Sequence, residues 1–64
     1  MSRDFGIWMK TRRKKKYMSQ VRLADKLGVH VNSVIRWESG TAFPPLDMAE
    51  MIIEILGGRL KIEV

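Results

Sequence analysis

The sequence predicts a small, mainly α-helical domain: a compact set of four helices followed by a short C-terminal strand. Two observations predict this fold class. Apolar residues recur at helical spacing in separate stretches, and glycines or prolines fall between the later ones. The last residues, 59–64, instead alternate polar and apolar side chains, which is typical of a strand. With 64 residues, the chain forms one domain, 1–64, that buries only roughly 60% of its unfolded surface.

The first helix is expected over residues 7–18, and its middle is almost entirely charged. Apolar side chains at its two ends are available for the core. They are Ile7, Trp8, Met9, Tyr17 and Met18.

A second helix is expected at about 19–27 with Ser19 as its N-cap, and a third at about 30–38. Leu23 and Leu27 stand four apart, and Val34 and Trp37 stand three apart, so each helix presents one narrow apolar face. Gly28 suits a left-handed helix end, after which Val29 folds back onto the seam between the two helices. Residues 19–38 therefore have the layout of a helix-turn-helix.

A fourth helix is expected at about 45–56, after an extended segment fixed by Pro44 and Pro45. One stripe of this helix is assigned to the core: Leu46, Ala49, Ile52, Ile53 and Leu56. A second stripe, of Met48, Met51 and Ile55, exceeds what so small a core can use. The strand at 59–64 places Leu60, Ile62 and Val64 on one side; it pairs with residues near 3–7, pairs with a second copy, or does not form.

Charge is unevenly distributed along the chain. Residues 1–22 hold eight Lys or Arg and one Asp, whereas residues 23–64 hold four basic and six acidic side chains. The first third is therefore +7 and the remainder −2, which indicates an acidic polymer or surface as the partner, or else a solvated helix face.

Several classes are disfavoured by composition. The chain has no cysteine, and its one histidine has no clustered partner, so neither a disulfide framework nor a metal site is expected, and no cofactor is expected. No nucleophile, base and orienting group converge as in an enzyme. No apolar run reaches the ~20 residues of a membrane span, and no signal peptide follows the basic stretch, so we expect a cytoplasmic protein.

Anchor residues at fixed offsets carry a resemblance to a known family. They are Arg13, Ser19, Gln20, Leu23, Ala24, Leu27, Gly28, Val29, Val34, Trp37, Glu38, Gly40, Pro44, Leu46, Ile52 and Leu56. Over about residues 9–57 the chain resembles the phage-repressor and Cro-type helix-turn-helix DNA-binding proteins, also called Xre-like. The resemblance implies a lambda-repressor-like fold in which the helix at about 30–38 enters the DNA major groove.

The resemblance assigns roles to individual residues. The base-contacting side chains would be Val31, Asn32 and Arg36, with Ser33 close by; Arg36 suits guanine, Asn32 suits adenine, and Val31 suits a thymine methyl group. The DNA phosphate contacts would be Ser19, Gln20, His30, Ser39, Thr41, Lys14 and Arg22. Arg13 and Glu38 match a structural ion pair that joins the first helix to the end of the third. The simpler alternatives are that these polar side chains are merely solvated, that Asn32 and Ser33 only cap the helix, and that Glu38 is exposed.

The chain departs from the family pattern at two positions of the third helix. His30 stands where Ser or Thr is usual, so the N-cap is weakened or moves to Asn32. Ile35 stands where a polar residue is more common, and it contacts DNA sugars, meets a neighbouring chain or is exposed.

The function favoured by the sequence is a sequence-specific regulator of transcription, expected to be a repressor, that binds double-stranded DNA as a homodimer. One such domain reads only a few base pairs, so two copies on adjacent half-sites are needed. The expected contact between copies is formed by Met48, Met51, Ile55, Leu60, Ile62 and Val64. Two alternatives are an antitoxin, whose apolar C-terminal region binds a toxin, and non-specific binding of RNA or anionic membrane by residues 10–16.

Overall fold

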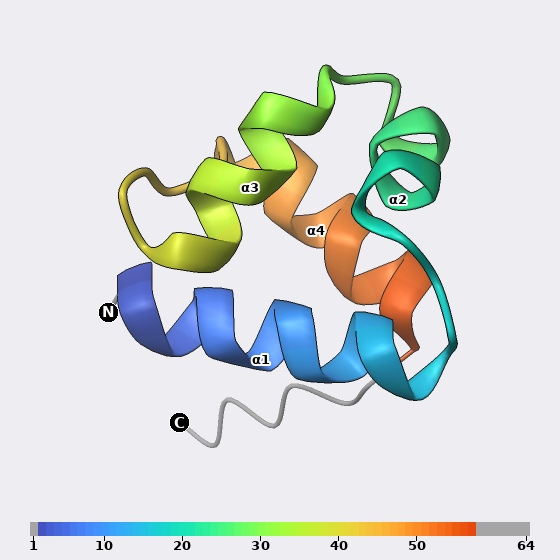
Figure 1. The fold of residues 1–64 in the computed structure, drawn as a ribbon. Helices are drawn as coiled ribbons and strands as arrows, with labels where there is room; N and C mark the ends of the chain where they lie inside the picture. The colour runs from blue at the N-terminus through green and yellow to red at the C-terminus, as the bar shows by residue number, and fades with distance from the viewer. Residues whose placement is uncertain (1, 58–64) are drawn as a thin grey trace.

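A computed structural model describes residues 2–57, which form four helices: α1 (Ser2–Lys15), α2 (Gln20–Leu27), α3 (Val31–Ser39) and α4 (Leu46–Leu56) (Figure 1). The predicted class, a compact four-helix domain with a central helix-turn-helix, is confirmed. No strand occurs between residues 2 and 57, and the strand predicted at 59–64, with Leu60, Ile62 and Val64, lies outside the described residues.

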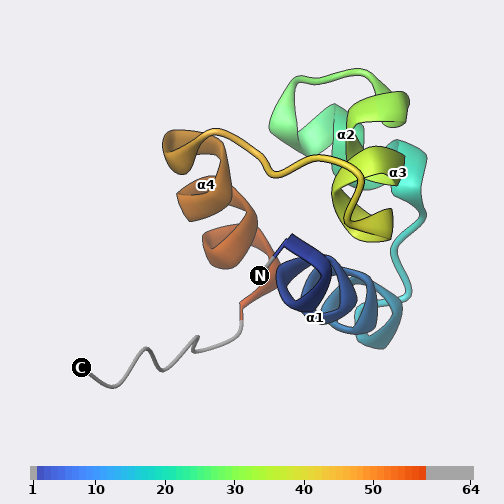
Figure 2. The same cartoon turned by 90° about the vertical axis from the view of Figure 1, so that its left-hand side faces the viewer.

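The helices surround one core. Helix α1 runs along the base, with α3 above its N-terminal part and α2 above its C-terminal end (Figure 1). Turned by 90°, the domain shows α2 and α3 on one side and α4 on the other (Figure 2). The fully or nearly fully buried apolar side chains that fill the space between them are Met9, Leu23, Ala24, Leu27, Val34, Trp37, Ile52 and Leu56. None of the helices within 2–57 is long and apolar enough to cross a membrane.

The turn between α2 and α3 follows the local chemistry of its sequence. The Ser19 hydroxyl accepts a hydrogen bond from the Arg22 N–H at 3.0 Å, which caps the start of α2. Gly28 ends α2 in the left-handed conformation at φ 71°, where a Cβ would be strained. The Val29 N–H donates to the Ala24 carbonyl at 3.0 Å, and the Val29 side chain packs on the core. These predicted features are confirmed.

Helix α1 differs from its predicted bounds of 7–18. It begins at Ser2 and ends at Lys15, because Tyr17 adopts a left-handed conformation at φ 54° that turns the chain towards α2. The prediction of Tyr17 as a core residue is therefore wrong: its side chain is 97% exposed. Ile7 is also exposed rather than buried, since the buried face of α1 passes through Gly6, Met9 and Arg13.

Two predictions about the apolar stripes of α4 are wrong. Leu46 is not a core residue: it is the first residue of α4 and is 78% exposed. The second stripe is less exposed than predicted, because Met48 and Ile55 are half-buried and pack against the core, while Met51 is exposed. Ala49, Ile52 and Leu56 form the buried face as predicted.

Helix α1 approaches the end of α3 unusually closely. A Cβ added at Gly6 would lie 2.5 Å from the backbone carbonyl oxygens of Trp37 and Glu38. Only glycine permits this contact, since the neighbouring atoms are backbone and cannot move aside.

Helix α1 also contacts the end of α4. The Arg12 Nη2 donates to the carbonyls of Leu56 and Gly57 at 3.2 and 2.8 Å, which caps the C-terminus of α4.

Candidate nucleic-acid interface

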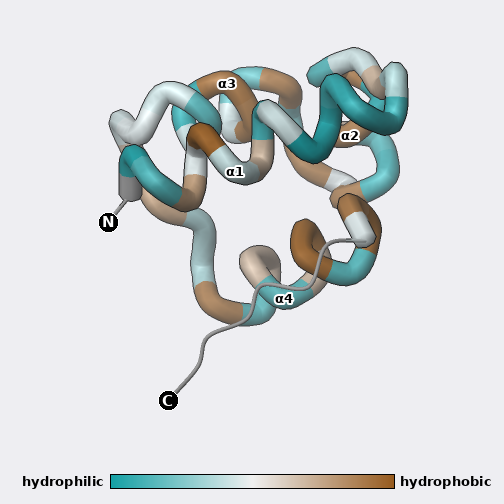
Figure 3. The backbone as a smooth tube through the Cα atoms, turned by 90° about the horizontal axis from the view of Figure 1, so that it is seen from below, coloured by the Kyte–Doolittle hydropathy of each residue, from teal (hydrophilic) through white to brown (hydrophobic). Residues whose placement is uncertain are grey.

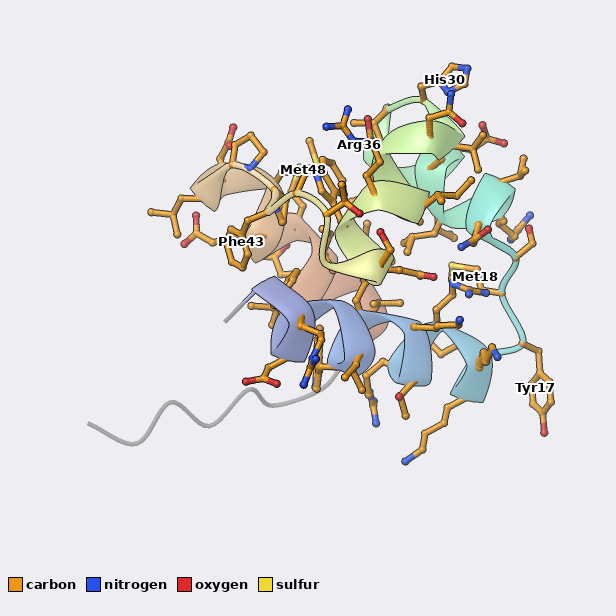
Figure 4. The ribbon with its side chains drawn as sticks, turned by 60° about the vertical axis from the view of Figure 1, so that its left-hand side comes forward. Tyr17, Met18, His30, Arg36, Phe43 and Met48 are labelled. Atoms are coloured by element: carbon orange, nitrogen blue, oxygen red, sulfur yellow. The ribbon has the colours of Figure 1, made fainter. Side chains whose placement is uncertain are left out.

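The outer face of α3 carries the side chains predicted to contact bases. Val34, Trp37 and Glu38 turn into the domain, so Asn32 and Arg36, one turn apart, are left on the exposed side. Arg36 projects away from the body of the domain (Figure 4). Exposed amide and guanidinium groups one turn apart on a helix are the groups that bind base edges in the major groove.

Two neighbouring side chains of α3 are less available than Asn32 and Arg36. Val31 is half-buried and packs against the core, so only part of its surface faces outward, and Ser33 is also half-buried. Ile35 is 43% exposed beside Arg36. This places one apolar side chain on the flank of the exposed polar face.

His30 provides the N-cap of α3. Its Nδ1 accepts a hydrogen bond from the Asn32 N–H at 3.1 Å, so the cap neither is lost nor moves to Asn32. Since an accepting Nδ1 carries no hydrogen, the neutral imidazole holds its hydrogen on Nε2. His30 is exposed and points outward on the same side as Arg36 (Figure 4). The imidazole can therefore cap the helix with one nitrogen and donate outward with the other.

A buried ion pair fixes the opposite end of α3. Arg13 donates from Nε to Glu38 Oε2 at 2.7 Å and from Nη2 to Oε1 at 3.0 Å, and its Nη1 donates to the Met18 carbonyl at 2.9 Å. The two side chains are 8% and 3% exposed. The structure therefore brings Arg13 and Glu38 together inside the domain, with both charges hydrogen-bonded as burial requires.

Gln20, the first residue of α2, joins this pair. Its Nε2 donates to Glu38 Oε1 at 3.0 Å. A carboxylate can only accept, so the group that faces it must be the NH₂ end of the amide, and one hydrogen on Nε2 remains for another acceptor. Gln20 thus links the start of α2 to the end of α3. The sequence did not predict this link, because the family resemblance assigns Gln20 only to a phosphate contact.

The hydroxyl and backbone N–H groups around the loop between α3 and α4 donate hydrogen bonds within the domain. Ser39 Oγ donates to the Arg36 carbonyl at 3.0 Å and lies 2.8 Å from Thr41 Oγ1, so Thr41 donates to Ser39. The Thr41 and Ala42 N–H groups also donate to the Arg36 carbonyl, at 3.0 and 3.3 Å. In this arrangement neither hydroxyl hydrogen is free for a phosphate.

The basic residues of α1 divide into two groups. Arg12 and Arg13 hold the fold together, whereas the other basic side chains of the helix are exposed: Arg3, Lys10, Lys14 and Lys15. The colouring by hydropathy shows the charged second half of α1 as a markedly hydrophilic stretch (Figure 3). Arg22, in the first turn of α2, is likewise exposed. Fewer basic side chains are thus free to contact a polyanion than the sequence suggests, since Arg13 is paired with Glu38 and Arg12 is bound to carbonyls at the end of α4.

A family model described as helix-turn-helix matches residues 9–61, most of the chain. This chain belongs to the phage-repressor and Cro-type helix-turn-helix family. The curated proteins and the solved structures that were searched gave no significant match. Members of this family are DNA-binding regulators of transcription, and the helix-turn-helix of this chain is formed by α2 and α3. The exposed face of α3 and the capped start of α2, which carry the predicted contact residues, therefore both lie within this helix-turn-helix.

Proposed function

We propose that this protein is a sequence-specific DNA-binding repressor that inserts α3 into the major groove as one half of a homodimer. One observation carries the proposal: within a helix-turn-helix domain, Asn32 and Arg36 stand exposed on α3 while its other face is fixed to the core. A rigid helix with two base-reading side chains one turn apart matches the width of the major groove. The cytoplasm, where such a repressor meets its DNA, is its proposed location.

The base contacts are assigned by chemistry and exposure. Arg36 would donate two hydrogen bonds to guanine, and Asn32 would donate to and accept from adenine. Val31 offers only the outward part of its side chain to a thymine methyl group. Ser33, which is also half-buried, is assigned a base contact close by. Arg36 and Asn32 are therefore expected to determine most of the sequence preference.

The phosphate contacts gather at the start of α2 and along the rim of the motif. Gln20 would use its remaining Nε2 hydrogen, and Ser19 its hydroxyl hydrogen, since the Ser19 oxygen already accepts from Arg22. A phosphate at this helix start also meets free backbone N–H groups. His30, through Nε2, and the exposed Lys14 and Arg22 complete the proposed set, whereas Ser39 and Thr41 would join only by exchanging their internal hydrogen bonds.

The contact between two copies is proposed on the exposed flank of α4. Met51 is exposed there beside the half-buried Met48 and Ile55. The residues Leu60, Ile62 and Val64, which lie outside the described part of the chain, are proposed to extend this surface. A two-fold axis here would place two copies of α3 on successive half-sites.

Selection of bound duplexes from random DNA tests the proposal, with the mass in solution measured alongside. Recovery of one defined two-fold site and a dimeric mass are the expected results. Recovery of no preferred sequence would contradict specific recognition. A stable monomer would contradict the homodimer and favour the antitoxin alternative, in which the apolar flank binds a toxin.

A further inference from the structure

The loop between α3 and α4 has no positively charged side chain, but the first turn of α1 places one beside it. The segment from Gly40 to Leu46 contains no charged side chain. Two of its residues, Pro44 and Pro45, also have no backbone N–H to offer a phosphate. The N–H groups of Gly40, Thr41 and Ala42 are directed to carbonyls at the end of α3. A phosphate beside this loop therefore finds no unengaged donor on residues 40–42.

Arg3 lies directly against this loop. A Cβ added at Gly40 would lie 3.0 Å from the Arg3 Cα and 3.4 Å from its Cβ, and Gly40 has a φ of 79°. The Arg3 side chain itself is exposed. Its backbone is thus held at the end of α3 while the guanidinium group is free to reach outward by several ångströms.

Two further contacts hold the first turns of α1 in this place. Gly6 allows the helix to touch the carbonyls of Trp37 and Glu38, as described above. The rings of Phe5 and Phe43 lie 5.2 Å apart and join α1 to the loop itself. The backbone of Arg3 is consequently fixed in a packed helix, which lowers the conformational entropy that Arg3 loses when it binds a phosphate.

We propose that Arg3 contacts the DNA phosphate backbone beside the α3–α4 loop and supplies the positive charge that this loop lacks. This inference rests on the proposed function, since it assumes that α3 occupies the major groove. The phosphates that flank the groove then pass the C-terminal end of α3, where Arg3 lies. A guanidinium group binds a phosphate through two parallel hydrogen bonds, so the contact fixes orientation and carries no sequence information.

The experiment measures the salt dependence of binding for two duplexes: one recovered by selection with the wild-type protein, and an unrelated duplex of the same length. The variants are Arg3→Met, which keeps an unbranched aliphatic side chain without the charge, and Arg3→Lys, which keeps the charge. Lys26→Met, a change in the last turn of α2 to which we assign no DNA contact, is the matched control. The urea midpoint of each variant is measured to verify that the fold is retained.

Arg3→Met is expected to flatten the plot of log K against log[salt] by about 0.9 for each bound chain, equally for both duplexes. Arg3→Lys is expected to restore the slope, and Lys26→Met to leave it unchanged. An unaltered slope for Arg3→Met, with specific binding intact in the wild type, would overturn this inference and leave the proposed function standing. If selection with the wild-type protein recovers no preferred duplex, the proposed function and this inference are both overturned.

A second measurement alters the DNA and leaves the protein unchanged. Single phosphates of the selected duplex are replaced in turn by neutral methylphosphonates. One position per half-site is expected to weaken binding by the wild-type protein several-fold, and to have no such effect on Arg3→Met, because the partner is already missing. If every position that weakens the wild type weakens Arg3→Met equally, Arg3 contacts no phosphate.

Discussion

Replacement of Glu38 by Gln is expected to destabilise the domain more than any surface change. The substitution keeps the shape of the side chain but removes the negative charge. The Arg13 guanidinium would then remain buried with the Met18 carbonyl as its only other acceptor. One end of the new amide would also present donors to Arg13 or Gln20, which donate to Glu38 in the wild type.

The magnitude follows from the burial of the pair. Removing one partner of a buried ion pair typically costs about 3–5 kcal/mol. A domain of 64 residues has a total free energy of unfolding of only about 3–10 kcal/mol. Glu38→Gln is therefore expected to remove a large part of the stability, or all of it. Urea unfolding followed by far-ultraviolet circular dichroism measures the loss.

A double variant, Arg13→Met with Glu38→Leu, is the matched control. It replaces both charges with apolar side chains of similar length and should recover most of the loss, since no buried charge is left unpaired. A loss below about 1 kcal/mol for Glu38→Gln is the value of an exposed ion pair. That result would refute the conclusion that this pair is buried and holds α1 to α3.

Three other changes test the remaining contacts. Gly6→Ala is expected to cost about 1–3 kcal/mol in urea unfolding, because the added methyl group meets backbone carbonyls, even though alanine favours a helix; a gain in stability would contradict the close packing. His30→Ala is expected to lose about 1 kcal/mol through the lost cap, whereas His30→Asn, whose Oδ1 can replace Nδ1, should lose less; equal losses would show that Nδ1 is not the cap. Replacing Lys14 and Lys15 together by Ala should weaken binding to all duplexes alike and reduce its salt dependence, so a loss confined to one duplex would contradict a purely electrostatic role.

The helix-turn-helix was predictable because its signals are local. A serine that caps α2, a glycine at its left-handed end and apolar residues three or four apart act within one turn of the chain. The bounds of α2 and α3 consequently agree with the prediction to within about one residue at each end.

The start of α1 was not predictable for the opposite reason. Residues 2–6 contain no helical apolar pattern, and Gly6 by itself disfavours a helix. The helix extends there because Gly6 and Phe5 contact the end of α3 and Phe43, which are distant in the sequence. Arg3 could not be placed beside the α3–α4 loop without that tertiary contact.

The cap of α3 shows a limit of reasoning from residue types. Ser and Thr are favoured N-caps because a side-chain oxygen accepts a backbone N–H. The Nδ1 of His30 provides an equivalent acceptor, at 3.1 Å from the Asn32 nitrogen. The prediction of which α4 side chains are buried was wrong for another reason. Periodicity shows which residues share a face of a helix, but not how wide a face the other helices cover.

The base preferences of the wild-type protein and of Arg36→Ala, compared by selection from one pool of random duplexes, test the central claim most directly. The proposed role of α3 predicts that the wild type recovers a defined site. It also predicts that Arg36→Ala recovers the same site with one base position relaxed in each half-site, at a cost of roughly 1–3 kcal/mol per half-site. Identical preferences at every position for the two proteins would contradict the proposal that Arg36, on the exposed face of α3, reads the DNA sequence.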